Sequence, residues 1–131
     1  MKFLCLIYLN EKEMDAMPAG DMNALNAKHL AFNDGLRKSG HFIEAEALEP
    51  STMTACIRVR HGKPSLTDGP FAETKELVAG FYLIEARDMN EALQIAAKIP
   101  VARFGGVEVR PILRLERDAA GNPVVLAGEP R

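Results

Sequence analysis

Cysteine is scarce in this sequence, and its two cysteines show no spacing that suggests a disulfide framework or a zinc site. Cys5 and Cys56 form neither a Cys-x-x-Cys motif nor a Cys/His ligand pattern. Both lie in segments with the alternation of β-strands, so we expect two buried free thiols. His29, His41 and His61 also lack ligand spacing with one another. Only the fold could bring a metal-binding set together, and we expect no metal.

The sequence also lacks a long apolar run and a marked excess of charge. No run approaches the roughly 20 residues that a membrane-spanning helix needs, and the net charge is -2 with a pI of about 5.9. The short apolar N-terminus is followed by polar residues 10–13 instead of a small-residue cleavage site, so we expect a strand there. We expect a soluble, cytoplasmic protein that binds neither nucleic acid nor a membrane.

Standard catalytic and nucleotide-binding motifs are absent. The sequence contains no Gly-x-Gly-x-x-Gly, no Walker loop, no His-Glu-x-x-His and no Gly-x-Ser-x-Gly. Because these motifs position phosphates, zinc or a nucleophilic serine, a nucleotide or metal enzyme of a standard type is not expected. We predict no cofactor. The 131 residues are enough for one domain with a hydrophobic core.

What is present is a pattern of strands and helices. Residues 2–9 are apolar on both alternating faces, which is typical of a central strand, and residues 77–85 are similar around Gly80, where we expect a bulge or a close backbone approach. A helix capped by Asp21 is predicted to end at Gly40. A second helix follows the capping box at residues 88–91 and ends at Pro100. The remaining strands are predicted at 41–48 and 52–60, which should pair as a hairpin, and at 107–115, where Pro111 indicates an edge or a bulge.

This order predicts an α+β fold of the ferredoxin-like, split β-α-β type, with two helices on one face of an antiparallel sheet and one added hairpin strand. Apolar residues on both faces of strands 2–9 and 77–85 require a second covering layer, most simply a second copy of the chain. We therefore expect a homodimer with its sheets packed face to face. The domain is expected to span residues 1–116, followed by a tail, 117–131, that is loose or forms a short added strand.

A polar segment at residues 64–76 separates two strand-like segments and contains Asp68-Gly69-Pro70-Phe71. Asp can bond its own backbone, Gly adopts angles that other residues avoid, and Pro fixes its own angle. This turn should hold the Asp68 carboxylate and the Phe71 ring in defined directions. The alternative is a rigid hairpin tip with Phe71 as a plug.

With residues 68–76 in a strand-loop-strand context, the sequence resembles the DGPF-domain branch of the YCII-related proteins over about residues 1–115. Further matching segments are residues 1–8, 28–32, 46–48, 80–83, 88–100 and 106–111. The resemblance implies a ferredoxin-like domain in a dimeric α/β-barrel arrangement. It also implies a His and an Asp paired in a pocket; one relative acts as a dehydrochlorinase on a chlorinated hydroxyquinol. DGPF members are often found beside extracytoplasmic-function sigma factors, which implies a regulatory or accessory setting.

His29 is the first candidate for chemistry, because it lies in the apolar stripe of its helix and should point at the sheet. A carboxylate partner would orient the ring and make it a general base near neutral pH. Asp68 is the expected partner, in the same chain or across the dimer, and would raise the pKa of His29 above about 6.5. The alternative is a core histidine bonded to a backbone carbonyl, with Asp68 serving the turn alone.

Tyr8, Phe71, Thr74 and Lys75 are the expected contacts of a small-molecule ligand, with Tyr8 as a donor and Lys75 as an anion contact. Structural alternatives exist: a solvated Lys75, a packed Tyr8 ring and a local turn bond from Thr74. Two functions follow. One is an enzyme that performs proton abstraction or elimination on a small ring or carbonyl compound, and the other is a non-catalytic module that senses a ligand or binds a partner in transcriptional regulation.

Overall fold

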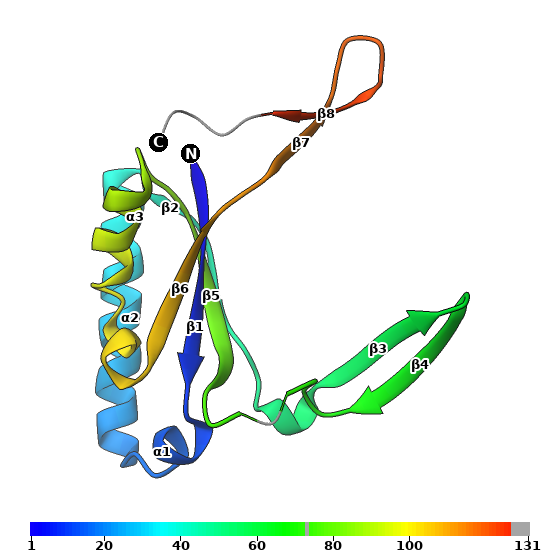
Figure 1. The fold of residues 1–131 in the computed structure, drawn as a ribbon. Coiled ribbons are helices and arrows are strands. Elements are labelled where there is room, and N and C mark those ends of the chain that lie inside the picture. Colours follow the sequence, from blue (N-terminus) through cyan, green and yellow to red (C-terminus); the bar gives the residue numbers. More distant parts are fainter. Residues whose placement is uncertain (73, 127–131) are drawn as a thin grey trace.

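The computed structural model describes residues 1–72 and 74–126 of the chain as a mixed α+β structure (Figure 1). Its helices are α1 (Glu11–Asp15), α2 (Ala19–Ser39) and α3 (Met89–Ala96), with short 3-10 helices η1 (Ser51–Met53) and η2 (Pro100–Phe104). Its strands are β1 (Lys2–Leu9), β2 (Phe42–Ala47), β3 (Ala55–Arg60), β4 (Lys63–Asp68), β5 (Leu77–Glu85), β6 (Gly106–Pro111), β7 (Arg114–Arg117) and β8 (Pro123–Leu126). The predicted α+β class is confirmed.

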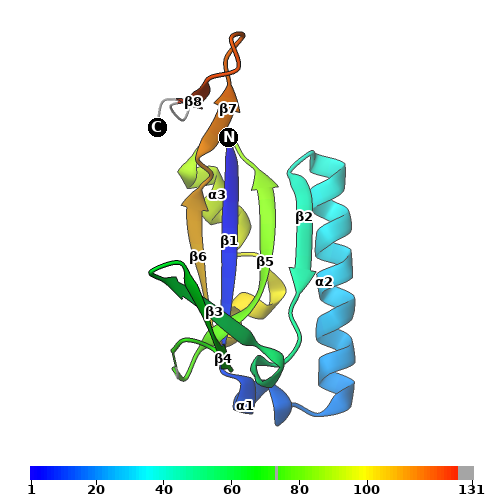
Figure 2. The same cartoon turned by 90° about the vertical axis from the view of Figure 1, so that its right-hand side faces the viewer.

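The main sheet has the strand order β2-β5-β1-β6, and every neighbouring pair is antiparallel. Helix α2 connects β1 to β2 with β5 between them, and α3 connects β5 to β6 with β1 between them. Strand β1 is therefore central, as its two apolar faces predict. Figures 1 and 2 show α2 and α3 on the same face of this sheet.

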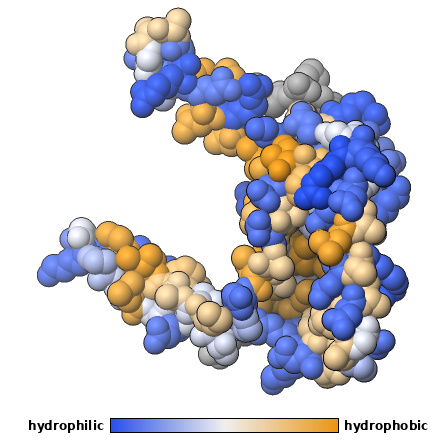
Figure 3. Space-filling model, turned by 180° about the vertical axis from the view of Figure 1, so that it is seen from behind, coloured by the Kyte–Doolittle hydropathy of each residue, from blue (hydrophilic) through white to orange (hydrophobic). Residues whose placement is uncertain are grey.

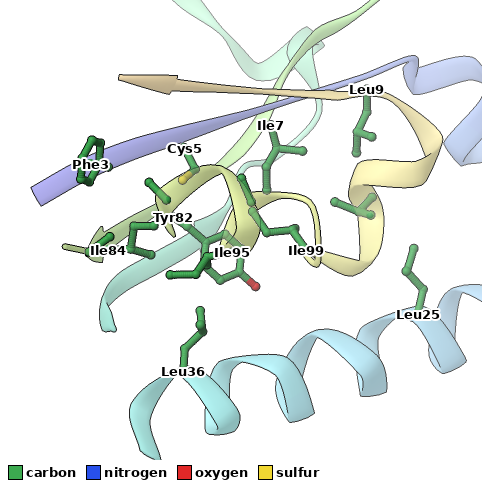
Figure 4. Close-up of a cluster of buried hydrophobic side chains, with 14 residues drawn as sticks. Phe3, Cys5, Ile7, Leu9, Leu25, Leu36, Tyr82, Ile84, Ile95 and Ile99 are labelled. Atoms are coloured by element: carbon green, nitrogen blue, oxygen red, sulfur yellow. The ribbon is translucent and has the colours of Figure 1, made fainter. Parts of the chain in front are cut away.

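The hydrophobic core lies between the sheet and these helices (Figure 4). Alternate residues of β1, from Phe3 to Leu9, are buried there together with Tyr82 and Ile84 of β5. Cys5 and Cys56 are both buried free thiols, as predicted, and burial raises the pKa of Cys5 to about 11. The intervening residues of β1 and β5 form the opposite face of the sheet, which we call the open face: Leu4, Leu6, Tyr8, Phe81 and Leu83. Within the described residues no helix covers this face.

Capping residues in the sequence predicted the end of α2 and the start of α3, but not the start of α2. Gly40 ends α2 in the left-handed conformation, with φ of 80°. Asp88 caps α3 by accepting a hydrogen bond from the Glu91 N–H at 2.8 Å. The predicted Asp21 cap is wrong, because α2 already begins at Ala19 after Pro18 and Asp21 lies in its first turn. Between β1 and α2, the Asn10 side chain caps the short helix α1, which was not predicted from the sequence.

Two backbone predictions in the sheet are confirmed. A Cβ at Gly80 would lie 2.7 Å from the carbonyl oxygen of Glu46, and the pairing of β1 with β5 shifts register between Ile7 and Tyr8. Gly80 therefore marks both a close approach and a bulge. Pro111 ends β6, which is an edge strand of the sheet.

The predicted hairpin between residues 41–48 and 52–60 is wrong. Strand β2 pairs with β5, and β3 pairs with β4 in a separate two-stranded sheet. Strand β4 includes residues 64–68 of the polar segment that was expected to be a loop. The turn between β3 and β4 consists of His61 and Gly62, with φ of 52° and 75°. Two consecutive residues with positive φ match the twist of a tight hairpin, so this local turn competes successfully with pairing to β2.

Two hairpins project from the side of the sheet that the helices leave uncovered (Figure 1). We call β3–β4 the first arm and β7–β8 the second arm. The tail was expected to be loose or to form a short added strand, and β8 is such a strand. In Figure 3 hydrophobic side chains gather on both arms. The exposed apolar residues are Ile57, Val59 and Leu66 on the first arm, and Leu115 and Val125 on the second. In the part of the chain described, no helix is long and apolar enough to cross a membrane.

Candidate functional site

A cavity of about 480 Å³ lies between helix α2 and the sheet, and we call it the His29 cavity. From α2 it is lined by Met22, Leu25, Asn26, His29, Leu30 and Asn33, and from the sheet by Ile7, Leu9, Ala45, Ala47, Ala79, Gly80 and Tyr82. Residues of α1, the segment Glu46 to Pro50 and Val101 of η2 complete its wall. This volume is in the range of small-molecule sites. The apolar stripe of the sequence therefore does turn His29 toward the sheet.

His29 takes part in a short chain of side-chain hydrogen bonds. Its Nδ1 lies 3.2 Å from the hydroxyl oxygen of Tyr82, and that hydroxyl donates to Oδ1 of Asn33 at 2.5 Å. Because the single hydroxyl proton goes to Asn33, the Tyr82 oxygen can only accept from His29. His29 then carries its proton on Nδ1, and its Nε2 has a free lone pair. Nε2 makes no hydrogen bond within residues 1–72 and 74–126.

Burial keeps both ends of this contact neutral. Burial raises the pKa of Tyr82 to about 12, so the phenol stays protonated, although the Asn33 contact acts in the opposite direction. Burial lowers the pKa of His29 from its usual 6.5. The predicted rise in the His29 pKa is therefore not found in the single chain, because desolvation acts there and the Asp68 carboxylate does not line the cavity. At neutral pH, His29 presents a neutral imidazole with a basic Nε2.

Asp68 does not line the cavity that contains His29. Asp68 is the last residue of β4, paired with Ala55, and its side chain makes no hydrogen bond within the described residues. The next residue, Gly69, has φ of 83°, as the turn predicted, and its N–H donates to the carbonyl of Thr54 at 2.7 Å. The expected bond from the Asp68 side chain to its own backbone is not found within residues 1–72 and 74–126. A pairing of Asp68 with His29 across two copies stays a prediction.

Two of the four expected ligand contacts share a second cavity. Tyr8 and Thr74 line a hollow of about 510 Å³, whose wall includes the segment Leu48 to Pro50 that also borders the His29 cavity. The Tyr8 hydroxyl donates to Glu108 at 3.1 Å, and the Thr74 hydroxyl donates to the Glu76 carbonyl at 2.6 Å. Both hydroxyl protons are therefore already engaged.

The other two expected contacts line neither of these cavities. The Phe71 side chain is 61% exposed, and the Arg58 guanidinium lies 4.1 Å from the centre of its ring. This contact holds the Phe71 ring on the surface of the first arm. The ring is therefore not the buried plug that the alternative interpretation predicted. Lys75 is exposed and forms no ion pair within the described part of the chain.

Sequence reasoning missed Tyr82 and Asn33. Asn33 lies four residues after His29, so both side chains project from the same face of α2. Tyr82 lies two residues after Gly80 and shares its helix-facing side of β5. Each spacing could be found in the sequence, but neither shows that the two elements meet. No group of three or more His, Cys, Asp or Glu residues suited to a metal occurs in the described ranges.

The fold and this cavity define a small α+β protein with a half-buried histidine beside a ligand-sized cavity. The profile of the YCII-related domain matches residues 1–116. The chain belongs to the YCII-related family. It is also similar to an uncharacterized protein of Rhizobium meliloti, with 36% identity over 103 residues that cover 77% of each chain.

The titration of His29 tests its surroundings. We expect NMR to give a His29 ring pKa below 6.5, because burial disfavours the imidazolium. The unfolded chain then binds the proton more readily, so this residue makes the free energy of unfolding fall as pH drops from about 6.5 to the lower folded pKa. His29→Gln should remove that dependence. A His29 pKa above 6.5 that Asp68→Asn lowers would instead show the Asp68 pairing across two copies.

Proposed function

We propose that this protein binds a small ring or carbonyl compound in the His29 cavity and that His29 acts there as a general base. The observation that carries the proposal is the hydrogen-bond chain from His29 Nδ1 through Tyr82 to Asn33, which leaves Nε2 as the basic atom. A base within a largely apolar cavity can remove a proton from carbon or oxygen while little water competes. Departure of a leaving group would complete an elimination.

The roles of the three side chains follow from their contacts. Nε2 of His29 would accept the substrate proton, and the charge that forms on the ring would be stabilised by the Nδ1–H contact with the Tyr82 oxygen. Asn33 accepts the hydrogen bond that the Tyr82 hydroxyl donates, so a lone pair of the Tyr82 oxygen is left to accept from His29. Tyr82 and Asn33 are positioning residues in this scheme, because they act through His29.

The experiment uses 5-nitrobenzisoxazole, a neutral ring compound that reports general-base catalysis. A base removes its ring C–H proton, the electron pair forms the nitrile, and the N–O bond breaks to release a coloured phenolate. We expect saturable turnover faster than in buffer, with a rate that rises as His29 loses its proton. Saturable binding of this compound without turnover would contradict the base and favour the non-catalytic, ligand-sensing alternative.

We further propose that the chain forms a homodimer through the open face of its sheet, as a ferredoxin-like domain of the dimeric α/β-barrel type. The strand order β2-β5-β1-β6 with two split β-α-β connections supports this topology. Half-buried Leu4, Leu6, Phe81 and Leu83 on the open face, together with the exposed apolar residues of the two arms, support the dimer. The Asp68-Gly-Pro-Phe71 turn supports a place in the DGPF branch.

Light scattering tests the dimer. We expect about twice the 14.4 kDa chain mass for the wild type and the single-chain mass for Leu6→Lys, because the ammonium group of a lysine at the centre of the open face would lose its hydration in the apolar interface. Leu93→Lys is the matched control, since Leu93 is 50% exposed on α3, on the other side of the sheet. A wild type that stays at the single-chain mass at micromolar concentration would disprove the dimer.

A further inference from the structure

In the proposed reaction, negative charge forms on an oxygen of the substrate as His29 removes a proton. When Nε2 takes a proton from the carbon beside a carbonyl, the C–H electron pair forms a new double bond and the carbonyl electrons move onto the oxygen. In 5-nitrobenzisoxazole the same charge appears on the phenolate oxygen. A hydrogen-bond donor aimed at that oxygen stabilises the transition state more than the substrate, and so it accelerates the reaction.

Two side chains that line the His29 cavity have hydrogen-bond donors to offer this oxygen. Among the described residues, the polar lining consists of Asn26, His29, Asn33, Tyr82 and four carboxylate residues. An ionised carboxylate only accepts hydrogen bonds. The Nδ1 proton of His29 and the hydroxyl proton of Tyr82 are already used in the chain that ends at Asn33. The side-chain amides of Asn26 and Asn33 remain.

These two amides lie on opposite sides of His29 along α2. Asn26 is three residues before His29 and Asn33 is four residues after it, so all three share one face of the helix. The Tyr82 hydroxyl bonds both His29 Nδ1 and Asn33, so it lies on the Asn33 side of the imidazole ring. Nε2 is at a different edge of the ring from Nδ1 and points away from that hydroxyl. A substrate that meets Nε2 is therefore beside the turn of α2 that carries Asn26.

The Asn26 amide is also free to bind a ligand. Its side chain forms no hydrogen bond within residues 1–72 and 74–126, and the residue is exposed although it lines the cavity. The Asn33 amide is committed to Tyr82 through Oδ1, and this contact fixes its plane. Met22 and Leu30 line the cavity near Asn26 on the same helix and have no donor that would compete for the substrate oxygen.

We propose that Asn26 is a second catalytic residue of this site: its side-chain N–H groups donate to the substrate oxygen on which negative charge develops while His29 takes the proton. This inference rests on the proposed function, because it assigns a role in the same reaction. It also narrows the substrate class to compounds in which the departing proton lies close to a carbonyl or ring oxygen. One molecule can then meet Nε2 and the Asn26 amide together.

Asn26→Leu tests this role, because leucine is similar in size and its side chain donates no hydrogen bond. We expect the kcat for 5-nitrobenzisoxazole to fall about tenfold while KM stays within about twofold of the wild type, since the substrate is neutral before the proton leaves. The midpoint of the pH profile should not move, because the hydrogen-bond chain from His29 to Asn33 is intact.

Two further measurements do not depend on that one variant. Asn26→Asp keeps the shape of the side chain and should lower kcat at least as far, because a carboxylate repels the developing charge. Binding of the coloured phenolate product, followed by its absorbance, should be about tenfold weaker in Asn26→Leu than in the wild type. Circular dichroism confirms that each variant is folded.

Asn23→Leu is the matched control, because it makes the same change on α2 at an exposed residue that does not line the cavity. Its kcat and KM should equal those of the wild type. If His29→Gln loses turnover but Asn26→Leu keeps kcat within about twofold, or only raises KM, the role of Asn26 is overturned and the general base stands. Wild-type protein without turnover would overturn both proposals.

Discussion

Replacing His29 with glutamine is expected to lower the rate of 5-nitrobenzisoxazole turnover by at least about 100-fold while the protein stays folded. Glutamine is similar in size and its amide can still donate to the Tyr82 oxygen, so the packing beside Tyr82 is largely kept. It has no basic nitrogen at neutral pH. The loss therefore reports the lone pair of Nε2 and not the shape of the cavity. Initial rates, with circular dichroism as the check on folding, measure it.

Two further variants separate the base from its positioning residue. His41→Gln is the matched control, because His41 bonds Ser39 and Glu91 and does not line the His29 cavity, and its turnover should equal that of the wild type. Tyr82→Phe removes the acceptor of the Nδ1 proton, so both neutral tautomers become populated. We expect about a tenfold fall in rate and a shifted pH profile. Turnover within about twofold of wild type in His29→Gln would exclude His29 as the base.

Gly105→Ala is expected to be the most destabilising small substitution in the chain, with a loss of about 3 kcal/mol or more in the free energy of unfolding. A Cβ at Gly105 would overlap the carbonyl oxygen of Tyr8 and lie 3.1 Å from a carboxylate oxygen of Glu76. The obstacle is backbone of the central strand β1, which cannot move without disturbing its pairing with β5 and β6. The effect is steric, because Gly105 has an extended φ of -161°.

The neighbouring residue provides the control for this prediction. A Cβ at Gly106 would meet no atom within 4 Å, so Gly106→Ala should change stability by less than about 1 kcal/mol. Urea unfolding of both variants, at one protein concentration because a dimer would link stability to concentration, gives the comparison. Equal stability of the two variants would mean that β1 moves away from Gly105 without cost.

Features that depend on a residue and its near neighbours could be predicted from the sequence. Two apolar faces predicted a central first strand, Gly40 predicted the end of α2, and the Asp88 box predicted the start of α3, because each rests on backbone bonds within a few residues. The helical period also turned His29 toward the sheet. These signals do not depend on which distant segment lies opposite.

Which segments of the chain pair with one another could not be predicted from local patterns. Strand β2 pairs with β5, which follows it in the sequence only after β3 and β4. The alternation of apolar and polar residues at 41–48 is equally compatible with pairing to β3. In the same way, the expected partner of His29 was a charged Asp68, and the partner within the single chain is the neutral Tyr82, 53 residues away. A carboxylate and a phenol can each orient an imidazole. Which of them reaches the ring depends on strand order and helix packing, and these are set by the burial of the whole apolar face.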